Sequence, residues 1–179
     1  MPIHPAPGEL ELVREFVNSV DVEEGTDELD TPDGLGRWLA AHDLGGGATL
    51  SERDRERAVE LRGAIRALLL ANGGEPLERN AVAALNRAGD DARLRVRFDE
   101  EGGSELAPAA GGIDAALARI LAIVHRSMAE GTWPRLKACR EDTCQWAFYD
   151  RSRNRSGAWC SMEVCGNRAK ARAFRERHA

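Results

Sequence analysis

Features that mark membrane proteins and several enzyme classes are absent from this sequence. It has no apolar run of about 18 residues, which excludes an ordinary membrane-spanning helix. It has no H-E-x-x-H or G-x-S-x-G motif and no glycine loop suited to holding a phosphate. The histidines are scattered, at His4, His42, His125 and His178. We therefore expect a protein that is not an enzyme and does not enter a membrane.

Cysteine is scarce and unevenly placed. The four cysteines form two C-x4-C pairs, Cys139 with Cys144 and Cys160 with Cys165, separated by fifteen residues. Two such pairs are typical of a structural zinc site, in which each pair forms one knuckle. Four soft thiolates close a tetrahedron around the ion and leave no position for a substrate. We predict one structural Zn2+ ion per chain, bound by these four residues.

Two disulfides, or a redox switch, are the alternatives to zinc. The first residues of the chain lack the charged and apolar regions of a secretory signal. We therefore expect a cytoplasmic protein, and disulfides are kept reduced in the cytoplasm. In that compartment the cysteine pattern favours a metal site.

The segment after Trp133-Pro134 carries a dense pattern around its cysteines. The pattern includes Cys165-Gly166-Asn167-Arg168 and, in chain order, Trp146, Phe148, Asp150, Ser152, Arg153, Asn154, Ser156, Trp159, Lys170 and Arg172. Over roughly residues 135 to 179 it resembles the CGNR zinc-finger family of bacteria. The resemblance implies a zinc-binding, DNA-binding module of a transcription regulator, and it implies no catalysed reaction.

The net charge of −5 hides a strong asymmetry along the chain. Residues 1 to 134 hold 14 lysines and arginines against 25 aspartates and glutamates, a net charge of −11. Residues 135 to 179 hold 11 against 5, a net charge of +6. One zinc ion with four thiolates would lower that excess to about +4. The asymmetry indicates that only the C-terminal segment meets nucleic acid.

Apolar spacing predicts a mainly α fold with a small β-hairpin (α+β). Helical periodicity indicates helices over residues 9–20, 31–44, 51–72, 76–88 and 113–130, the third of them starting at a capping box of Ser51 and Asp54. The fourth is expected to bury Leu77, Val82 and Leu85. The acidic stretch 21–30 is expected to be a solvated loop.

From Leu94 to Phe98, apolar residues alternate strictly with arginines, and this pattern predicts a strand with one face buried. Turn residues follow at 99–103, and a partner strand around residues 104–107 would complete the hairpin.

The N-terminal part bears a looser resemblance to a second family. The stretches Phe16-Val17-Asn18-Ser19, Trp38-Leu39 and Leu61-Arg62 resemble the ABATE domain that commonly precedes a CGNR finger. Those proteins are described only as proposed stress-induced transcription regulators, so the resemblance supplies no ligand. We place the boundary at Trp133-Pro134, giving an ABATE-like domain over residues 1–133 and a finger over residues 134–179. Asn18, Trp38 and Arg62 could line a ligand pocket, although core packing and a surface salt bridge explain them equally well.

We expect the finger to combine a hairpin and a helix in a treble-clef-like form. The hairpin is predicted over residues 145–159, with its tip at 151–157. The arginines and serines of the tip suit phosphate oxygens, although a merely soluble loop has the same composition. In the helix after Cys165, a basic stripe runs at i, i+4 and i+7, and Phe174 should face the finger. Asn167 could either cap the helix or contact adenine. The candidate nucleic-acid-binding residues are Arg153, Asn154, Arg155, Asn167, Arg168, Lys170, Arg172 and Arg175.

Two functions fit these features. The first is a DNA-binding transcription regulator whose acidic helical domain senses a ligand or a partner. The second is an interaction module whose finger docks a protein, or the acidic half of its own chain, without binding nucleic acid. Because one short finger offers a small interface, a homodimer is compatible with the first function.

Overall fold

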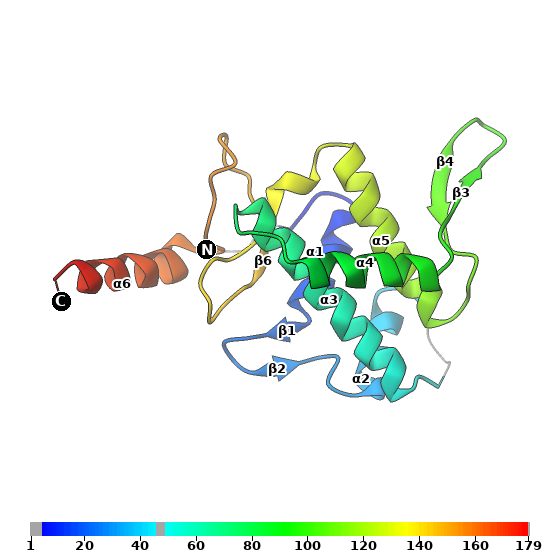
Figure 1. Cartoon of the computed structure of the whole chain (residues 1–179), viewed down its shortest axis with the longest axis horizontal. Coiled ribbons are helices and arrows are strands. Elements are labelled where there is room, and N and C mark those ends of the chain that lie inside the picture. Colours follow the sequence, from blue (N-terminus) through cyan, green and yellow to red (C-terminus); the bar gives the residue numbers. More distant parts are fainter. Residues whose placement is uncertain (1–4, 46–48, 179) are drawn as a thin grey trace.

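Helices form most of the structure, as the apolar spacing predicts. The computed structural model describes residues 5–45 and 49–178. The body consists of α1 (Leu10–Asn18), α2 (Pro32–Ala41), α3 (Glu52–Asn72), α4 (Arg79–Asp91) and α5 (Ile113–Ala129). A sixth helix, α6 (Asn167–His178), extends away from this body at one end of the molecule (Figure 1). No helix in these two ranges is both long and apolar enough to cross a membrane.

Three pairs of short antiparallel strands accompany the helices. They are β1 (Val20–Asp21) with β2 (Thr26–Asp27), β3 (Arg95–Phe98) with β4 (Ser104–Ala107), and β5 (Leu136–Ala138) with β6 (Ala147–Tyr149). The mainly α fold class with a small hairpin is therefore confirmed, and the β3–β4 hairpin has the predicted strands. The stretch 21–30 is mostly exposed, as expected, but it is not only a loop: it contains parts of β1 and β2, Leu29 is buried, and Asp27 pairs with Arg62.

Local side-chain bonds start two helices where the sequence predicts. The Ser51 hydroxyl accepts a bond from the Asp54 backbone N–H, and the Asp54 carboxylate accepts one from the Ser51 N–H. This capping box satisfies backbone groups that have no partner in the first turn of a helix. The Thr31 hydroxyl caps α2 in a similar way by accepting a bond from the Gly34 N–H.

One hydrophobic core joins the helices to the start of the finger. Many of its fully buried side chains come from α1, α3 and α5, among them Val13, Phe16, Leu61, Ile65, Leu117 and Ile120. The same core continues through Trp133, Leu136, Ala138 and Ala147. Strands β5 and β6 therefore rest on the helical body, so the two predicted domains are in contact at their boundary.

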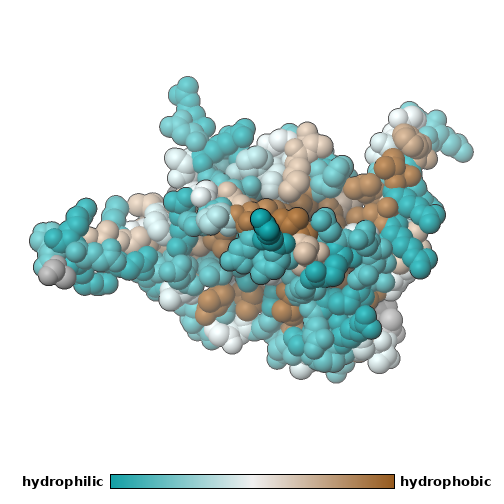
Figure 2. Space-filling view, viewed as in Figure 1, coloured by the Kyte–Doolittle hydropathy of each residue, from teal (hydrophilic) through white to brown (hydrophobic). Residues whose placement is uncertain are grey.

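The predicted burial of two apolar segments is wrong. All four residues of β3 are exposed, with Val96 at 58% and Phe98 at 79%, because the hairpin projects from the body and no second layer from the described residues covers it (Figures 1 and 2). Leu77, which precedes α4, and Val82 on α4 were expected inside but are 39% and 40% exposed. The small residues Ala81 and Ala84 are buried there instead, because they let α4 approach Ala64 of α3 closely.

The predicted hairpin of the finger is also wrong in its strand pairing. Only β6 comes from residues 145–159, and it pairs with β5, which precedes the first cysteine. Residues 150–157 form a loop instead of a second strand. The other edge of β6 is closed by Asn18, whose side chain exchanges two hydrogen bonds with the Ala147 backbone, at 2.9 and 2.7 Å. The treble-clef-like combination of a hairpin and a helix nevertheless holds, with β5, β6 and α6 as its parts.

Candidate metal centre and nucleic-acid interface

The four cysteine sulfurs meet between the β5–β6 hairpin and the start of α6. All four lie within 4.8 Å of one another. The Sγ–Sγ distances are 3.6 Å from Cys144 to Cys160 and 3.7 Å from Cys160 to Cys165. A tetrahedron with Zn–S bonds of about 2.3 Å has sulfurs about 3.8 Å apart. The observed cluster therefore fits one structural zinc ion, and the predicted ligand set comes together.

Hydrogen bonds within the protein shape the two knuckles. The Cys139 N–H donates to the Trp146 carbonyl at 2.9 Å, and the Cys144 N–H donates to the Glu141 carbonyl at 2.8 Å. Cys165 lies in a π-turn, Met162–Gly166, which the Ser161 hydroxyl caps at the Val164 N–H. A Cβ on Gly166 would lie 2.6 Å from the Met162 sulfur, so a larger residue there would require the Met162 side chain to move.

Repulsion between ionised thiols in the cluster favours the binding of a cation. Hydrogen bonds from Cys144 and Cys160 lower the pKa of the Cys139 thiol to about 2. Burial, followed by the charge on Cys139, raises the pKa of Cys165 to about 12, and the pKa values of Cys144 and Cys160 are also raised. One thiolate thus opposes ionisation of the others. A divalent ion removes this opposition and releases protons as it binds.

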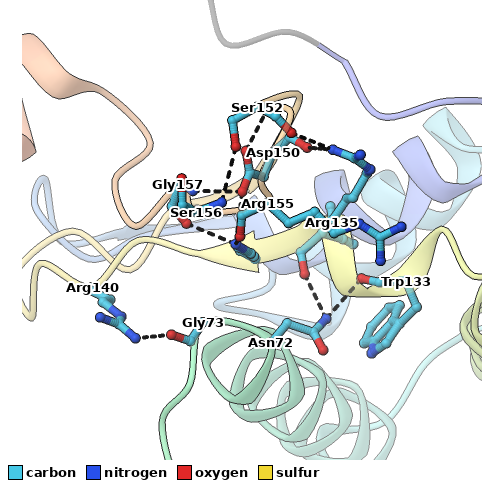
Figure 3. Close-up of polar contacts among 12 residues, drawn as sticks. Asn72, Gly73, Trp133, Arg135, Arg140, Asp150, Ser152, Arg155, Ser156 and Gly157 are labelled. Atoms are coloured by element: carbon cyan, nitrogen blue, oxygen red, sulfur yellow. Dashed lines mark hydrogen bonds and ion pairs between the residues drawn. The ribbon is translucent and has the colours of Figure 1, made fainter.

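A buried ion pair shapes the loop between β6 and the second cysteine pair. Lys137 on β5 donates to the Asp150 carboxylate at 2.8 Å, and both side chains are almost fully buried. The lysine also donates to the Arg155 carbonyl and, at 3.1 Å, to the Gly157 carbonyl. Asp150 accepts bonds from the backbone N–H groups of Ser152 and Gly157, at 2.9 and 2.8 Å (Figure 3). These contacts fix both ends of the loop, which we call the 150–157 loop.

The charges around Asp150 hold its carboxyl ionised. Burial raises its pKa, but hydrogen bonds from Lys137, Ser152 and Gly157 outweigh burial and lower the pKa to about 2. Gly157 contacts the carboxylate so closely that an added Cβ would lie 2.8 Å from its carbon. Arg135 donates to the Asp150 and Ser152 carbonyls, at 2.9 Å each (Figure 3).

The structure places most of the predicted nucleic-acid residues on the surface at one end of the molecule. Arg153, Asn154 and Arg155 are exposed on the 150–157 loop. None of the described residues of α6 is buried, and Lys170 and Arg175 are fully on the surface. Phe174 is exposed and stacks on His178, so the expectation that it faces the finger is wrong, because α6 leaves the body (Figure 1).

Two arginines of the predicted stripe already have acidic partners. Arg168 pairs with Glu23 of the β1–β2 turn at 2.6 Å. Arg172 holds both carboxylate oxygens of the buried Glu141, at 2.9 and 3.3 Å. Asn167 donates to the Glu163 carbonyl at 2.8 Å, a local contact within the turn that precedes α6. Arg168 thus joins the finger to the acidic body, whereas Arg172 stabilises the first knuckle.

Sequence reasoning missed the residues that position these groups. Lys137, Glu141 and Glu23 had no periodic or motif signal of their own. A lysine between two apolar residues of a short strand was the one hint for Lys137. Arg168 and Glu23 lie 145 positions apart in the chain, so no local pattern relates them.

The three candidate pocket residues have internal partners. The Asn18 side chain bonds to β6, as described above. Trp38 is buried and stacks on His42, with ring centres 3.9 Å apart, and it packs at a tilt against Phe16, with ring centres 5.3 Å apart. Arg62 forms two bonds of 2.6 Å with Asp27 and a third with Ser19. Structural roles account for each side chain, and a ligand pocket at these residues stays a prediction.

Comparison with known proteins agrees with the residue patterns. Residues 10–131 match the ABATE family, described as "Putative stress-induced transcription regulator", and residues 135–178 match the CGNR zinc finger. No curated protein shows a significant match to the chain. The ABATE match covers the helical body, and the CGNR match covers the cysteine cluster, the 150–157 loop and α6. The chain therefore belongs to the ABATE family and carries a C-terminal CGNR zinc finger.

Proposed function

We propose that this protein is a DNA-binding transcription regulator whose zinc finger contacts DNA and whose helical body senses a ligand or a partner. The observation that carries the proposal is the composition and exposure of α6. Five of its residues are lysine or arginine and one is acidic, and none of those described is buried. A short isolated helix is marginal in water and gains most of its stability from packing. A polyanion would give α6 a packing surface that the described part of the chain does not supply.

The 150–157 loop would add a second set of phosphate contacts. Arg153 and Arg155 extend from a loop whose ends are fixed by Lys137 and Asp150. A fixed backbone reduces the conformational entropy lost on binding. Guanidinium groups donate to phosphate in bidentate fashion, which suits positioning on a duplex more than reading its sequence.

Salt-dependent DNA binding tests the assignment of α6. The variant Lys170→Ala/Arg175→Ala/Arg177→Ala keeps a helix-favouring residue at each position. We expect weaker binding and a flatter plot of log K against log salt, by about 0.9 for each phosphate that the variant no longer neutralises. Arg87→Ala is the control, because it removes an exposed arginine of α4, outside the finger. An unchanged slope in the triple variant would remove α6 from the interface.

A second candidate function is supported by the Arg168–Glu23 contact. An interaction module whose finger docks acidic surfaces would use such pairs with other proteins, as it does with its own body. Glu23→Gln distinguishes the two functions. If the finger binds DNA, freeing Arg168 should tighten binding at low salt. If the finger is only an interaction module, neither the parent nor the variant should shift duplex DNA.

We also infer that the protein is not an enzyme. Four thiolates fill the coordination shell of a structural zinc ion, so the cluster has no open position for a substrate.

A further inference from the structure

The β3–β4 hairpin leaves an apolar groove beside α5. The groove encloses about 600 Å³, and its lining includes Val96 and Leu106 from the hairpin and Ala122 and Ile123 from α5. Val96 and Leu106 are directly paired across the hairpin, so their side chains share one face. Figure 2 shows hydrophobic side chains on the hairpin and at its base.

Phe98 extends this apolar face beyond the groove. It lies two positions from Val96 on the same side of β3 and is 79% exposed. Both strands are edges of a two-stranded sheet, and edge strands with exposed apolar residues favour association. We therefore expect this apolar face of the hairpin to become buried by association with another molecule.

The charges at the two ends of this surface are complementary. Glu100 and Glu101 are exposed at the hairpin tip, where Asp99 closes the turn by accepting backbone bonds from Glu101 and Gly103. Arg119 and Arg126 line the groove two helical turns apart, and they share the single carboxylate of Glu9. The lining also includes Glu105, which lies on β4, so the positive charge is concentrated on the α5 side of the groove. The acidic tip lies away from its own α5, so it does not neutralise that charge (Figure 1).

We propose that the occupant of the groove is the hairpin of a second copy of this chain. In a two-fold symmetric dimer, each hairpin inserts its Val96–Phe98 face into the groove of the partner copy and brings its acidic tip to the arginines there. Each copy supplies one hairpin and one groove, so the same surface of the protein forms the contact on both sides of the dimer. This assembly does not depend on DNA binding.

Charge reversal tests the arrangement in the zinc-loaded full chain. Sedimentation over a wide range of concentrations should show a monomer–dimer equilibrium for the parent protein. Glu100→Lys/Glu101→Lys alone and Arg119→Glu/Arg126→Glu alone should each raise the dimer dissociation constant at least about tenfold, because like charges then meet. An equimolar mixture of the two variants should dimerise again, because opposite charges meet at both contacts.

Apolar substitutions give an independent readout. Phe98→Ser should also raise the dissociation constant, whereas Val82→Ser, at an exposed apolar position on α4 outside the groove, should not. All of these side chains are exposed or at the rim, and circular dichroism verifies that each variant is folded. A parent protein that stays monomeric at every concentration would overturn the proposal, and so would a mixture that fails to dimerise.

Discussion

At the scale of single residues, the Lys137–Asp150 pair decides how the finger presents its surface. The lysine lies on the strand that enters the metal site, and the aspartate begins the loop that carries the arginines. Sequence alone identified Asp150 as part of the CGNR pattern but gave it no partner. The partner is found only when β5 and β6 pair across the first knuckle.

Lys137→Met should strongly destabilise the protein. It would leave Asp150 buried without its counter-ion, and breaking one side of a buried pair typically costs about 3–5 kcal/mol. The free energy of unfolding from urea titration measures the loss. Arg87→Ala, which removes an exposed pair with Glu60, should cost less than about 1 kcal/mol. A Lys137→Met variant as stable as that control would contradict the structural role of the pair.

Acid should weaken the fold through Asp150. Its pKa is about 2 in the folded protein, against about 3.9 in an unfolded chain. A folded-state pKa below the unfolded-state pKa stabilises the fold at pH values above the unfolded-state pKa. This contribution, about 2.6 kcal/mol, is lost as the pH falls from about 4 to about 2. Stability curves against pH for the parent and Asp150→Asn should therefore converge below pH 4. Parallel curves would show that Asp150 has no such role.

At the scale of elements, local sequence signals predicted which helices and strands form better than they predicted whether those elements are buried. The Ser51 capping box and the β3–β4 hairpin were predictable because both depend on neighbours in sequence. The exposure of β3 was not, because alternation reveals which face is apolar but not whether another layer covers it. The prediction of which α4 residues are buried failed for a similar reason. The close approach of α3 favours the small residues Ala81 and Ala84 over larger ones at the contact.

Ser51→Ala tests whether the capping box matters for α3, the longest helix. The substitution removes the acceptor of the Asp54 N–H and should lower the free energy of unfolding by about 1 kcal/mol. Thermal unfolding followed by circular dichroism measures the effect. No change in the unfolding temperature would mean that packing alone fixes the start of α3.

At the scale of the whole molecule, the finger and the helical body are linked at several points. The core runs through Leu136, Ala138 and Ala147, and Asn72 at the end of α3 donates to the Trp133 and Leu136 carbonyls at 2.9 and 2.8 Å (Figure 3). The cysteine spacing predicted the four-cysteine cluster that the structure brings together. The Arg168–Glu23 contact between finger and body could not be predicted, because it depends on the complete tertiary arrangement.

Removing zinc should therefore weaken more than the finger. Cys139 directly follows the core residue Ala138, so loss of the metal loosens β5 and the core beneath it. A chelator should lower the unfolding temperature of the helical body as well as the helical signal of α6, and added Zn2+ should restore both. An unfolding temperature unaffected by complete zinc removal would show that the body is independent of the finger.

In the function proposed above, zinc organises a basic surface that binds DNA. Fluorescence anisotropy with random-sequence duplex DNA, at several salt concentrations, compares the zinc-loaded protein with Cys165→Ser. We expect the parent protein to bind with an affinity that falls as salt rises, and the variant to lose that binding while its helical body stays folded. No binding by the parent protein at low salt, with one zinc per chain verified, would contradict the claim.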